Sequence, residues 1–138
     1  MSPQIDGIVE SALYVDDVER SVQFYQRILG FDVLFQDSRL GAMSVAGRQV
    51  LLLFKKGASA QPTMTDGGVI PASDGAGSLH LAFSIVKDTL DAWHEWLNEN
   101  GIAVESTVRW KRGGKSIYFR DPDRHLVELV TPGTWSVY

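Results

Sequence analysis

An internal repeat constrains the fold most strongly, because the same order of strand and helix signals occurs twice along the 138 residues. In each half, a stretch that alternates between apolar and small or polar side chains, as a half-buried strand does, precedes a helical pattern. Aligning the two opening strands pairs Glu10 with His80, an offset of 70, while Gly30 and Gly101, which end the two helical patterns, are 71 apart. This agreement predicts two copies of one structural unit. The opening strands are expected at residues 9–15 and 79–86.

The helix of each copy has its own start and stop signals. Asp16, with Glu19 three residues later, forms a capping-box pattern, and Asp88 is the corresponding cap in the second copy. Glycine follows each helix at the position typical of a C-terminal stop. Apolar residues recur at helical spacing: Val18, Val22, Tyr25 and Leu29 in the first copy, and Leu90, Trp93 and Leu97 in the second.

Each copy continues with three further expected strands. They are residues 31–35, 40–46 and 48–55 in the first copy, and residues 102–105, 115–120 and 124–130 in the second. The order β-α-β-β-β, found twice, predicts an α+β domain with a module at about residues 5–56 and another at about 78–131, followed by a tail at 132–138.

The stretch between the two modules, residues 57–77, differs from both in composition. It holds five glycines and two prolines and has no apolar periodicity. Long segments of this kind in small domains are usually linkers or mobile functional loops. We interpret it as a linker that also covers the mouth of a cleft.

Composition and charge restrict the possible partners and the chemistry. The net charge of −4 offers no basic face for nucleic acid, and no apolar run approaches the roughly 20 residues that span a bilayer. The first residues lack a signal-peptide pattern, so a cytoplasmic protein is expected. Because the chain has no cysteine, any metal site must use histidine and carboxylate ligands.

Three residues become notable through the repeat. Glu10 and His80 occupy equivalent places on the opening strands, and Glu128 lies among aliphatic residues on the expected last strand. Burying an unpaired carboxylate is costly, so two acids and a histidine at related positions favour a shared cation. Each residue also has a simpler interpretation. Glu10 could be a solvated residue of an edge strand, His80 a hydrogen-bonded core histidine, and Glu128 a partner of Arg109 or Arg120.

Three stretches closely resemble the vicinal oxygen chelate superfamily, which contains glyoxalases, bleomycin-resistance proteins and extradiol dioxygenases. They are residues 13–31 (with LYVDD, FY and LGF), 78–83 (SLHLAF) and 118–129 (YFRDPDRHLVEL). The resemblance implies two βαβββ modules in a cupped mixed sheet that holds one divalent ion: Mn, Fe, Ni, Co or Zn. It places the metal ligands at Glu10, His80 and Glu128. It also implies a homodimer.

The chain departs from the pattern of this superfamily at two positions. The ligand that falls on Glu10 is usually a histidine, and the change to a carboxylate favours harder ions such as Mn or Fe. Glyoxalase I enzymes carry a fourth ligand on the last strand of the first module. Counting back 76 residues from Glu128 places that position at Leu52, which cannot bind a metal. The expected site is therefore a three-ligand site with open positions, closer to the dioxygenase and fosfomycin-resistance branches.

Candidate substrate contacts lie on the expected strand at 115–120. Ser116, Tyr118 and Arg120 share one face of that strand, and by resemblance this face lines the cup. Trp110 is a further candidate wall residue, and we assign Glu10 and Tyr118 as candidate catalytic side chains. The preceding basic residues indicate either an anionic substrate or a solvated turn. They are Arg109, Lys111, Arg112 and Lys115.

Two classes of function fit these features. The first is a metal-dependent enzyme with dioxygenase-like or glyoxalase-like lyase chemistry, in which the ion acts as a Lewis acid on a small substrate with vicinal oxygens. The second is a metal-free binding protein of the bleomycin-resistance kind, with Trp110, Tyr118 and Trp135 in an aromatic cleft. A pure binder would not need the three expected ligands.

Overall fold

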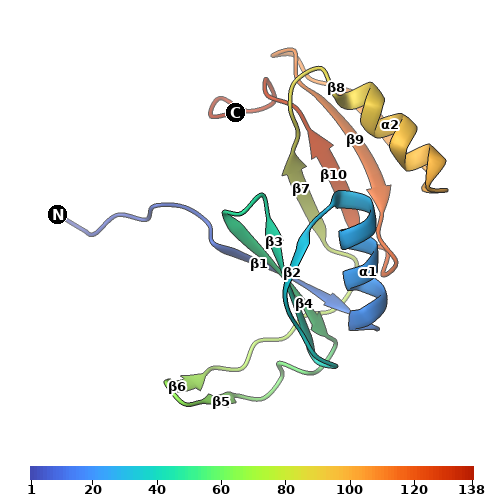
Figure 1. Cartoon of the computed structure of the whole chain (residues 1–138). Helices are drawn as coiled ribbons and strands as arrows, with labels where there is room; N and C mark the ends of the chain where they lie inside the picture. The colour runs from blue at the N-terminus through green and yellow to red at the C-terminus, as the bar shows by residue number, and fades with distance from the viewer. The chain divides into compact units, whose positions relative to one another are not determined.

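The strand and helix order expected from the repeat is present in the computed structural model, which describes residues 1–138 (Figure 1). Contacts divide the chain into two units, Met1–Gly77 (unit 1) and Ser78–Tyr138 (unit 2). The elements of unit 1 are β1 (Glu10–Val15), α1 (Val18–Leu29), β2 (Asp32–Gln36), β3 (Leu40–Val45), β4 (Gln49–Lys55), β5 (Thr63–Thr65) and β6 (Gly68–Ile70). The elements of unit 2 are β7 (His80–Ser84), α2 (Leu90–Glu99), β8 (Ser106–Arg109), β9 (Lys115–Arg120) and β10 (Leu126–Val130).

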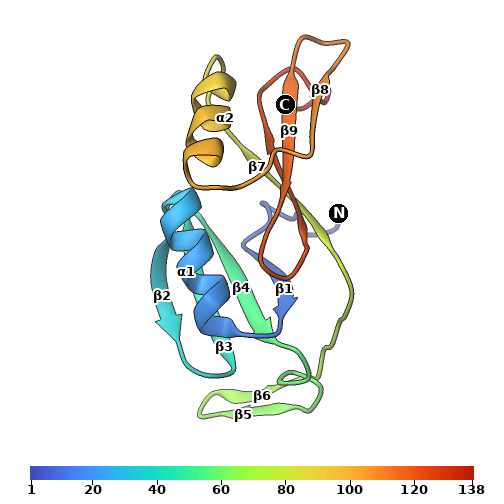
Figure 2. The same ribbon diagram turned by 90° about the vertical axis from the view of Figure 1, so that its right-hand side faces the viewer.

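Each unit forms its own mixed four-stranded sheet. The strand order is β1-β4-β3-β2 in unit 1 and β7-β10-β9-β8 in unit 2. In both sheets the first strand is parallel to the last, and the other pairs are antiparallel. Helix α1 packs on the sheet of unit 1, and α2 packs on the sheet of unit 2 (Figures 1 and 2). The predicted α+β fold with two βαβββ modules is confirmed.

Helix α1 begins and ends at well-defined caps. The N-cap is Asp17, whose side chain accepts a hydrogen bond from the Arg20 N–H at 3.1 Å, so the prediction of Asp16 as the cap was one residue early. At the other end Gly30 adopts a left-handed conformation with φ of 71°, as the glycine stop predicted. Between the caps, Val22, Tyr25 and Ile28 are buried against the sheet.

Helix α2 begins in a different way from the sequence prediction. Thr89 is the N-cap and makes no side-chain capping bond, whereas Asp88 lies outside the helix with φ of 67°. An aspartate tolerates this left-handed conformation better than most residues, so Asp88 serves the turn and not the cap. Leu90 and Leu97 are buried, and Gly101 follows the helix with φ of 72°. Neither helix is both long and apolar enough to cross a membrane.

The hydrophobic core of unit 1 lies between α1 and one face of its sheet. Leu13, Leu51 and Leu53 are almost fully buried there, and each such side chain stabilises the fold by roughly 1.5–3 kcal/mol. A Cβ atom at Gly41 would lie 2.5 Å from a methyl carbon of Val22, so only glycine lets α1 approach β3 this closely. On the opposite face of β1, Glu10 and Ala12 are exposed.

The core of unit 2 follows the same plan. Ile117, Phe119, Val127 and Leu129 are buried, and α2 contacts β9. The expected strand at residues 102–105 is wrong, because β8 begins only at Ser106. The alternating side chains of residues 102–105 reflect partial burial of Ile102 and Val104 after the helix, and the segment meets β9 at Glu105, whose N–H donates to the Tyr118 carbonyl at 2.7 Å.

The segment at residues 57–77 belongs to unit 1 and contains the short antiparallel hairpin β5–β6. Figure 2 shows this hairpin beyond the end of the sheet at which β1 and β4 finish. The segment returns along the unit, where Ser73 N–H donates to the Ser59 carbonyl at 2.9 Å. At Gly75 a Cβ would lie 2.5 Å from the Tyr14 ring, so the chain passes directly over that ring.

Candidate functional site

The two sheets have the same register, which defines equivalent positions in the repeat. Glu10 pairs with Val50 in unit 1, and His80 pairs with Leu126 in unit 2. Two residues further along, Leu52 pairs with Ala12, and Glu128 pairs with Ala82. Leu52 therefore occupies in unit 1 the position that Glu128 occupies in unit 2, as the sequence spacing predicted.

His80 and Glu128 meet on the sheet of unit 2. The Nε2 atom of His80 lies 3.2 Å from Oε1 of Glu128, while the Nδ1 atom lies 2.9 Å from the Leu126 carbonyl. A carbonyl oxygen only accepts hydrogen bonds, so Nδ1 carries a proton in this contact. In the neutral ring the lone pair is then on Nε2, directed towards the Glu128 carboxylate, and these two atoms can share a cation.

The carboxylate of Glu128 is held in place from the protein interior. Ser116, which is fully buried, donates its hydroxyl to Oε2 of Glu128 at 2.5 Å. The same hydroxyl oxygen accepts the indole N–H of Trp110 at 2.9 Å. The Glu128 side chain is only 10 % exposed, whereas that of His80 is 49 % exposed. The pair thus opens to solvent on the histidine side and is fixed on the serine side.

Tyr118 faces Glu128 across the β9–β10 ladder. Partial burial raises the pKa of its phenol, and the negative charge of Glu128 and a hydrogen bond with that carboxylate raise the pKa further. The ring centroid of Tyr118 is 6.2 Å from that of His80. A phenol with a raised pKa remains protonated at neutral pH, so Tyr118 is suited to donate a hydrogen bond or a proton, and not to act as a base.

Arg120 is already engaged by protein groups. Its guanidinium contacts Glu105 through Nε at 2.8 Å and Nη2 at 3.2 Å, and Nη1 donates to the Arg124 carbonyl at 3.1 Å. The Arg120 hydrogen bond holds the pKa of the Glu105 carboxyl below its usual value. Because Arg120 pairs with Glu105, it is not the partner of Glu128. A substrate anion at Arg120 would have to share this ion pair.

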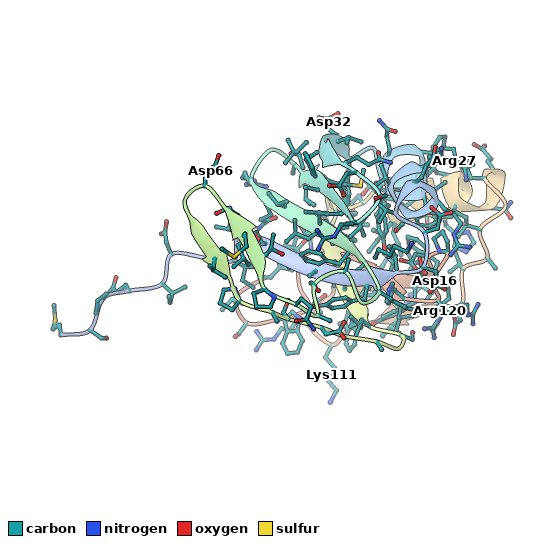
Figure 3. All side chains as sticks on the ribbon, turned by 90° about the horizontal axis from the view of Figure 1, so that it is seen from below. Asp16, Arg27, Asp32, Asp66, Lys111 and Arg120 are labelled. Carbon is teal, nitrogen blue, oxygen red and sulfur yellow. The ribbon has the colours of Figure 1, made fainter.

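The basic residues before β9 are exposed. Arg109 ends β8, and Lys111 and Arg112 belong to the turn that leads to Lys115. Figure 3 shows Lys111 extending away from the rest of the protein. Trp110 is 37 % exposed and Trp135 is 70 % exposed. The predicted roles of these residues towards a substrate remain predictions.

His125 is almost fully buried in unit 2. Its Nδ1 accepts the Leu79 N–H at 2.9 Å, and its own N–H donates to Oδ1 of Asp121 at the same distance. These bonds tie the turn between β9 and β10 to the residue that precedes His80. His125 thereby fixes the start of β7 beside β10. Its sequence signal is the polar DPDRH turn, which is too short to indicate burial.

Glu10 lies in unit 1, where it lines a pocket of about 470 Å³ together with Leu52. Glu10 is exposed, which fits a solvated position on an edge strand as well as it fits a metal ligand. The structure thus brings His80 and Glu128 together in unit 2. Within either unit, no group of three or more His, Asp or Glu side chains is arranged to hold a metal ion.

The comparison of the sequence with known families agrees with the fold. Residues 5–129 match the Glyoxalase/Bleomycin resistance protein/Dioxygenase superfamily, and the chain belongs to that superfamily. Its sequence is 32% identical over 129 residues to a metallothiol transferase FosB of Staphylococcus saprophyticus, a match that covers 92% of this chain and 78% of the relative.

Solved structures show the same fold. A lactoylglutathione lyase from Agrobacterium tumefaciens has a TM-score of 0.88 and 30% sequence identity, with 97% of this chain and 99% of that chain covered. The fosfomycin resistance protein FosX from Listeria monocytogenes, at 24% identity and a TM-score of 0.68, covers 93% of this chain and 94% of its own. The likeness to the latter concerns the fold alone.

Proposed function

We propose that the chain is a metal-dependent enzyme that acts on a small substrate with two vicinal oxygens, and that Glu10, His80 and Glu128 are the ligands of one divalent ion. A bound ion would supply Lewis-acid polarisation of the substrate oxygens. One imidazole and two carboxylates suit Mn, Fe, Ni, Co or Zn. The observation that carries the proposal is the convergence of His80 Nε2 and Glu128 Oε1 at 3.2 Å.

The chain's own residues have distinct roles in this proposal. The Leu126 carbonyl sets the orientation of the His80 ring, and Ser116 sets that of the Glu128 carboxylate. Tyr118, protonated at neutral pH, would donate to an oxygen of the substrate. The names of two relatives, a metallothiol transferase and a lactoylglutathione lyase, support enzymatic chemistry in this group without choosing between the reactions.

Metal analysis of protein purified without chelators tests the proposal. About one divalent ion per chain is expected. A protein that is metal-free after this purification, and that takes up no divalent ion on reconstitution, would instead be a binding protein of the bleomycin-resistance kind.

The hydroxyl of Ser116 provides a more specific prediction. Ser116→Ala should weaken the affinity for the divalent ion by roughly 10–100-fold, because outer-shell partners orient a ligand and typically contribute that much. The free energy of unfolding should also fall, since Glu128 loses a charge-assisted hydrogen bond worth about 1.5–3 kcal/mol. Isothermal titration with Zn²⁺ or Mn²⁺ measures the first effect, and urea unfolding measures the second.

Two control variants distinguish positioning from general damage. Ser44→Ala removes a serine hydroxyl that accepts a hydrogen bond from the Gly47 N–H at 3.1 Å. This variant should leave metal affinity unchanged. Trp110→Phe removes the indole donor of Ser116 and keeps an aromatic ring, and should weaken affinity less than Ser116→Ala. Unchanged metal affinity in Ser116→Ala would contradict the positioning role.

A two-fold homodimer is expected from the short two-module chain, since this is the commonest closed symmetry of soluble oligomers. Unit 1 also exposes large apolar side chains that include Val33, Leu34 and Phe35. Light scattering at micromolar concentration should give about twice the 15.3 kDa of one chain. A monomer under these conditions would refute the prediction.

The dimer can be tested further by complementation between two variants. Glu10→Gln and His80→Ala would each lose the metal site alone. If the three ligands come from two chains, unfolding and refolding the variants together should restore one of the two sites in the mixed dimer. If the ligands come from one chain, the mixture should bind no more metal than either variant alone.

A further inference from the structure

The pocket beside Glu10 is predominantly apolar. It has a volume of about 470 Å³, within the roughly 300–1,000 Å³ typical of small-molecule sites. The sheet face opposite α1 forms one wall, and residues from the 57–77 segment form the other. Its apolar lining residues are Phe35, Leu40, Leu52, Phe54, Ile70 and Pro71.

The repeat shows that this apolar character is particular to unit 1. On β9 and β10, Ser116 pairs with Val130 and Tyr118 pairs with Glu128. The equivalent pairs on β3 and β4 are Leu40 with Phe54 and Ala42 with Leu52.

Glu128 and the two polar residues that flank its carboxylate thus correspond to apolar residues in unit 1. Ser116 corresponds to Leu40, Tyr118 to Ala42 and Glu128 to Leu52. In unit 2 these positions hold a ligand carboxylate and its hydrogen-bond donors. In unit 1 Leu40 and Leu52 line the pocket, and Glu10, the equivalent of His80, is a polar group among them.

Apart from Glu10, the charged groups at the pocket are bound to the protein backbone. Oδ1 of Asp37 accepts the N–H groups of Arg39 and Leu40 at 2.8 and 2.9 Å. The Arg39 guanidinium donates to the Ala58 carbonyl at 2.6 Å and so ties the start of β3 to the 57–77 segment. These contacts hold the two walls together, and the lining between them offers hydrocarbon contact to a bound molecule.

We propose that this pocket binds an apolar substituent of the substrate, a phenyl ring or a short alkyl chain, while the vicinal oxygens lie at Glu10. This inference rests on the proposed function, because Glu10 lines the pocket and is one of the three proposed ligands. It defines the substrate class as a small amphipathic molecule, with two adjacent oxygens at one end and a hydrocarbon group at the other.

A series of hydroxamates tests the proposal, since each chelates a metal through two adjacent oxygens. Acetohydroxamate, butyrohydroxamate and hexanohydroxamate are titrated into the Zn²⁺-loaded protein by calorimetry. Affinity should rise roughly threefold to fourfold per added methylene, which corresponds to about 0.8 kcal/mol per buried CH₂. Equal affinity along the series would overturn the proposed pocket and leave the metal site intact.

Two leucine variants make the test specific. Leu52→Asn should flatten the dependence on chain length, because it places an amide in the apolar wall. Leu34→Asn is the matched control, since Leu34 is exposed on β2 and does not line the pocket. It should retain the wild-type dependence. If both variants behave alike, the gain in affinity does not come from this pocket.

A second probe separates the pocket from the metal site. 1-Hexanol is titrated into metal-free protein while methyl resonances are followed by NMR. Those of Leu40, Leu52 and Ile70 should shift saturably, and those of the core residues Leu13 and Leu97 should not. If no hydroxamate binds in a metal-dependent way but these shifts occur, the proposed function fails and the pocket stands. If hexanol shifts none of these three sets of resonances, the pocket proposal fails. That result is expected if a second copy of the chain fills the pocket.

Discussion

His80→Ala is expected to abolish binding of the divalent ion, with the dissociation constant rising more than roughly a hundredfold. Loss of an outer-shell partner alone typically costs 10–100-fold, and His80 is the only nitrogen ligand in the proposed set. The variant also leaves Glu128, with a side chain only 10 % exposed, without its imidazole neighbour. Metal content after dialysis and calorimetric titration with Mn²⁺ and Zn²⁺ measure the effect.

Matched variants identify which side chains form the site. His94→Ala removes an exposed histidine of α2 and should bind the ion as the wild type does. Glu128→Gln keeps an oxygen for the Ser116 hydroxyl but loses the negative charge, and should bind much more weakly. Glu10→Gln should do the same, with exposed Glu95→Gln as its control. Full occupancy in His80→Ala would refute the assigned centre, and wild-type affinity in Glu10→Gln would remove Glu10 from it.

Much of the fold could be predicted because the repeat supplies an internal check. Two glycine stops and two opening strands with almost the same offset define the modules without any long-range contact. A separate offset of 76 placed Leu52 at the position of Glu128 in the repeat, and the strand registers confirm it. Strand parity is fixed by the pleat, so a register known at one residue holds along the whole strand.

The errors concern features that depend on single dihedral angles or on pairing partners. Two aspartates, Asp16 and Asp17, can each cap α1, and only the extended backbone at Asp17 decides between them. Residues 102–105 alternate like a strand, but the paired residues of β8 begin at Ser106. Neither feature is encoded in the local pattern of apolar residues.

The approach of His80 to Glu128 was predictable from their strand positions, whereas the contacts around this pair were less so. Parity correctly placed Ser116 on the same face as Tyr118, yet it could not indicate that Ser116 is fully buried and bonded to Glu128. The simpler interpretation of His80 as a core residue is wrong, because its side chain is half exposed. The partner of Arg120 was also unpredictable. Glu105 reaches Arg120 only because β8 pairs with β9, which places the Glu105 N–H against the Tyr118 carbonyl.

The rate at which this protein isomerises the adduct of methylglyoxal and glutathione should be low. We expect the metal-reconstituted protein to be a poor catalyst of this reaction, with turnover roughly 10²–10⁴-fold below that of an enzyme with a general base at the fourth position, the range that such a base contributes. The isomerisation moves a proton between adjacent carbons, and in this chain Leu52 stands where Glu128 stands in the other unit. Leucine can neither bind the ion nor accept a proton.

The assay compares this protein with the lactoylglutathione lyase of Agrobacterium tumefaciens, to which it is 30% identical. D-lactoylglutathione formation is followed by absorbance, with metal content of both proteins matched. Low turnover, together with metal-dependent binding of acetohydroxamate, would support a three-ligand site open to a bidentate substrate. Because the strand register leaves no carboxylate at Leu52, robust turnover would require another base. Glu10, which lines the same pocket as Leu52, is then the candidate base.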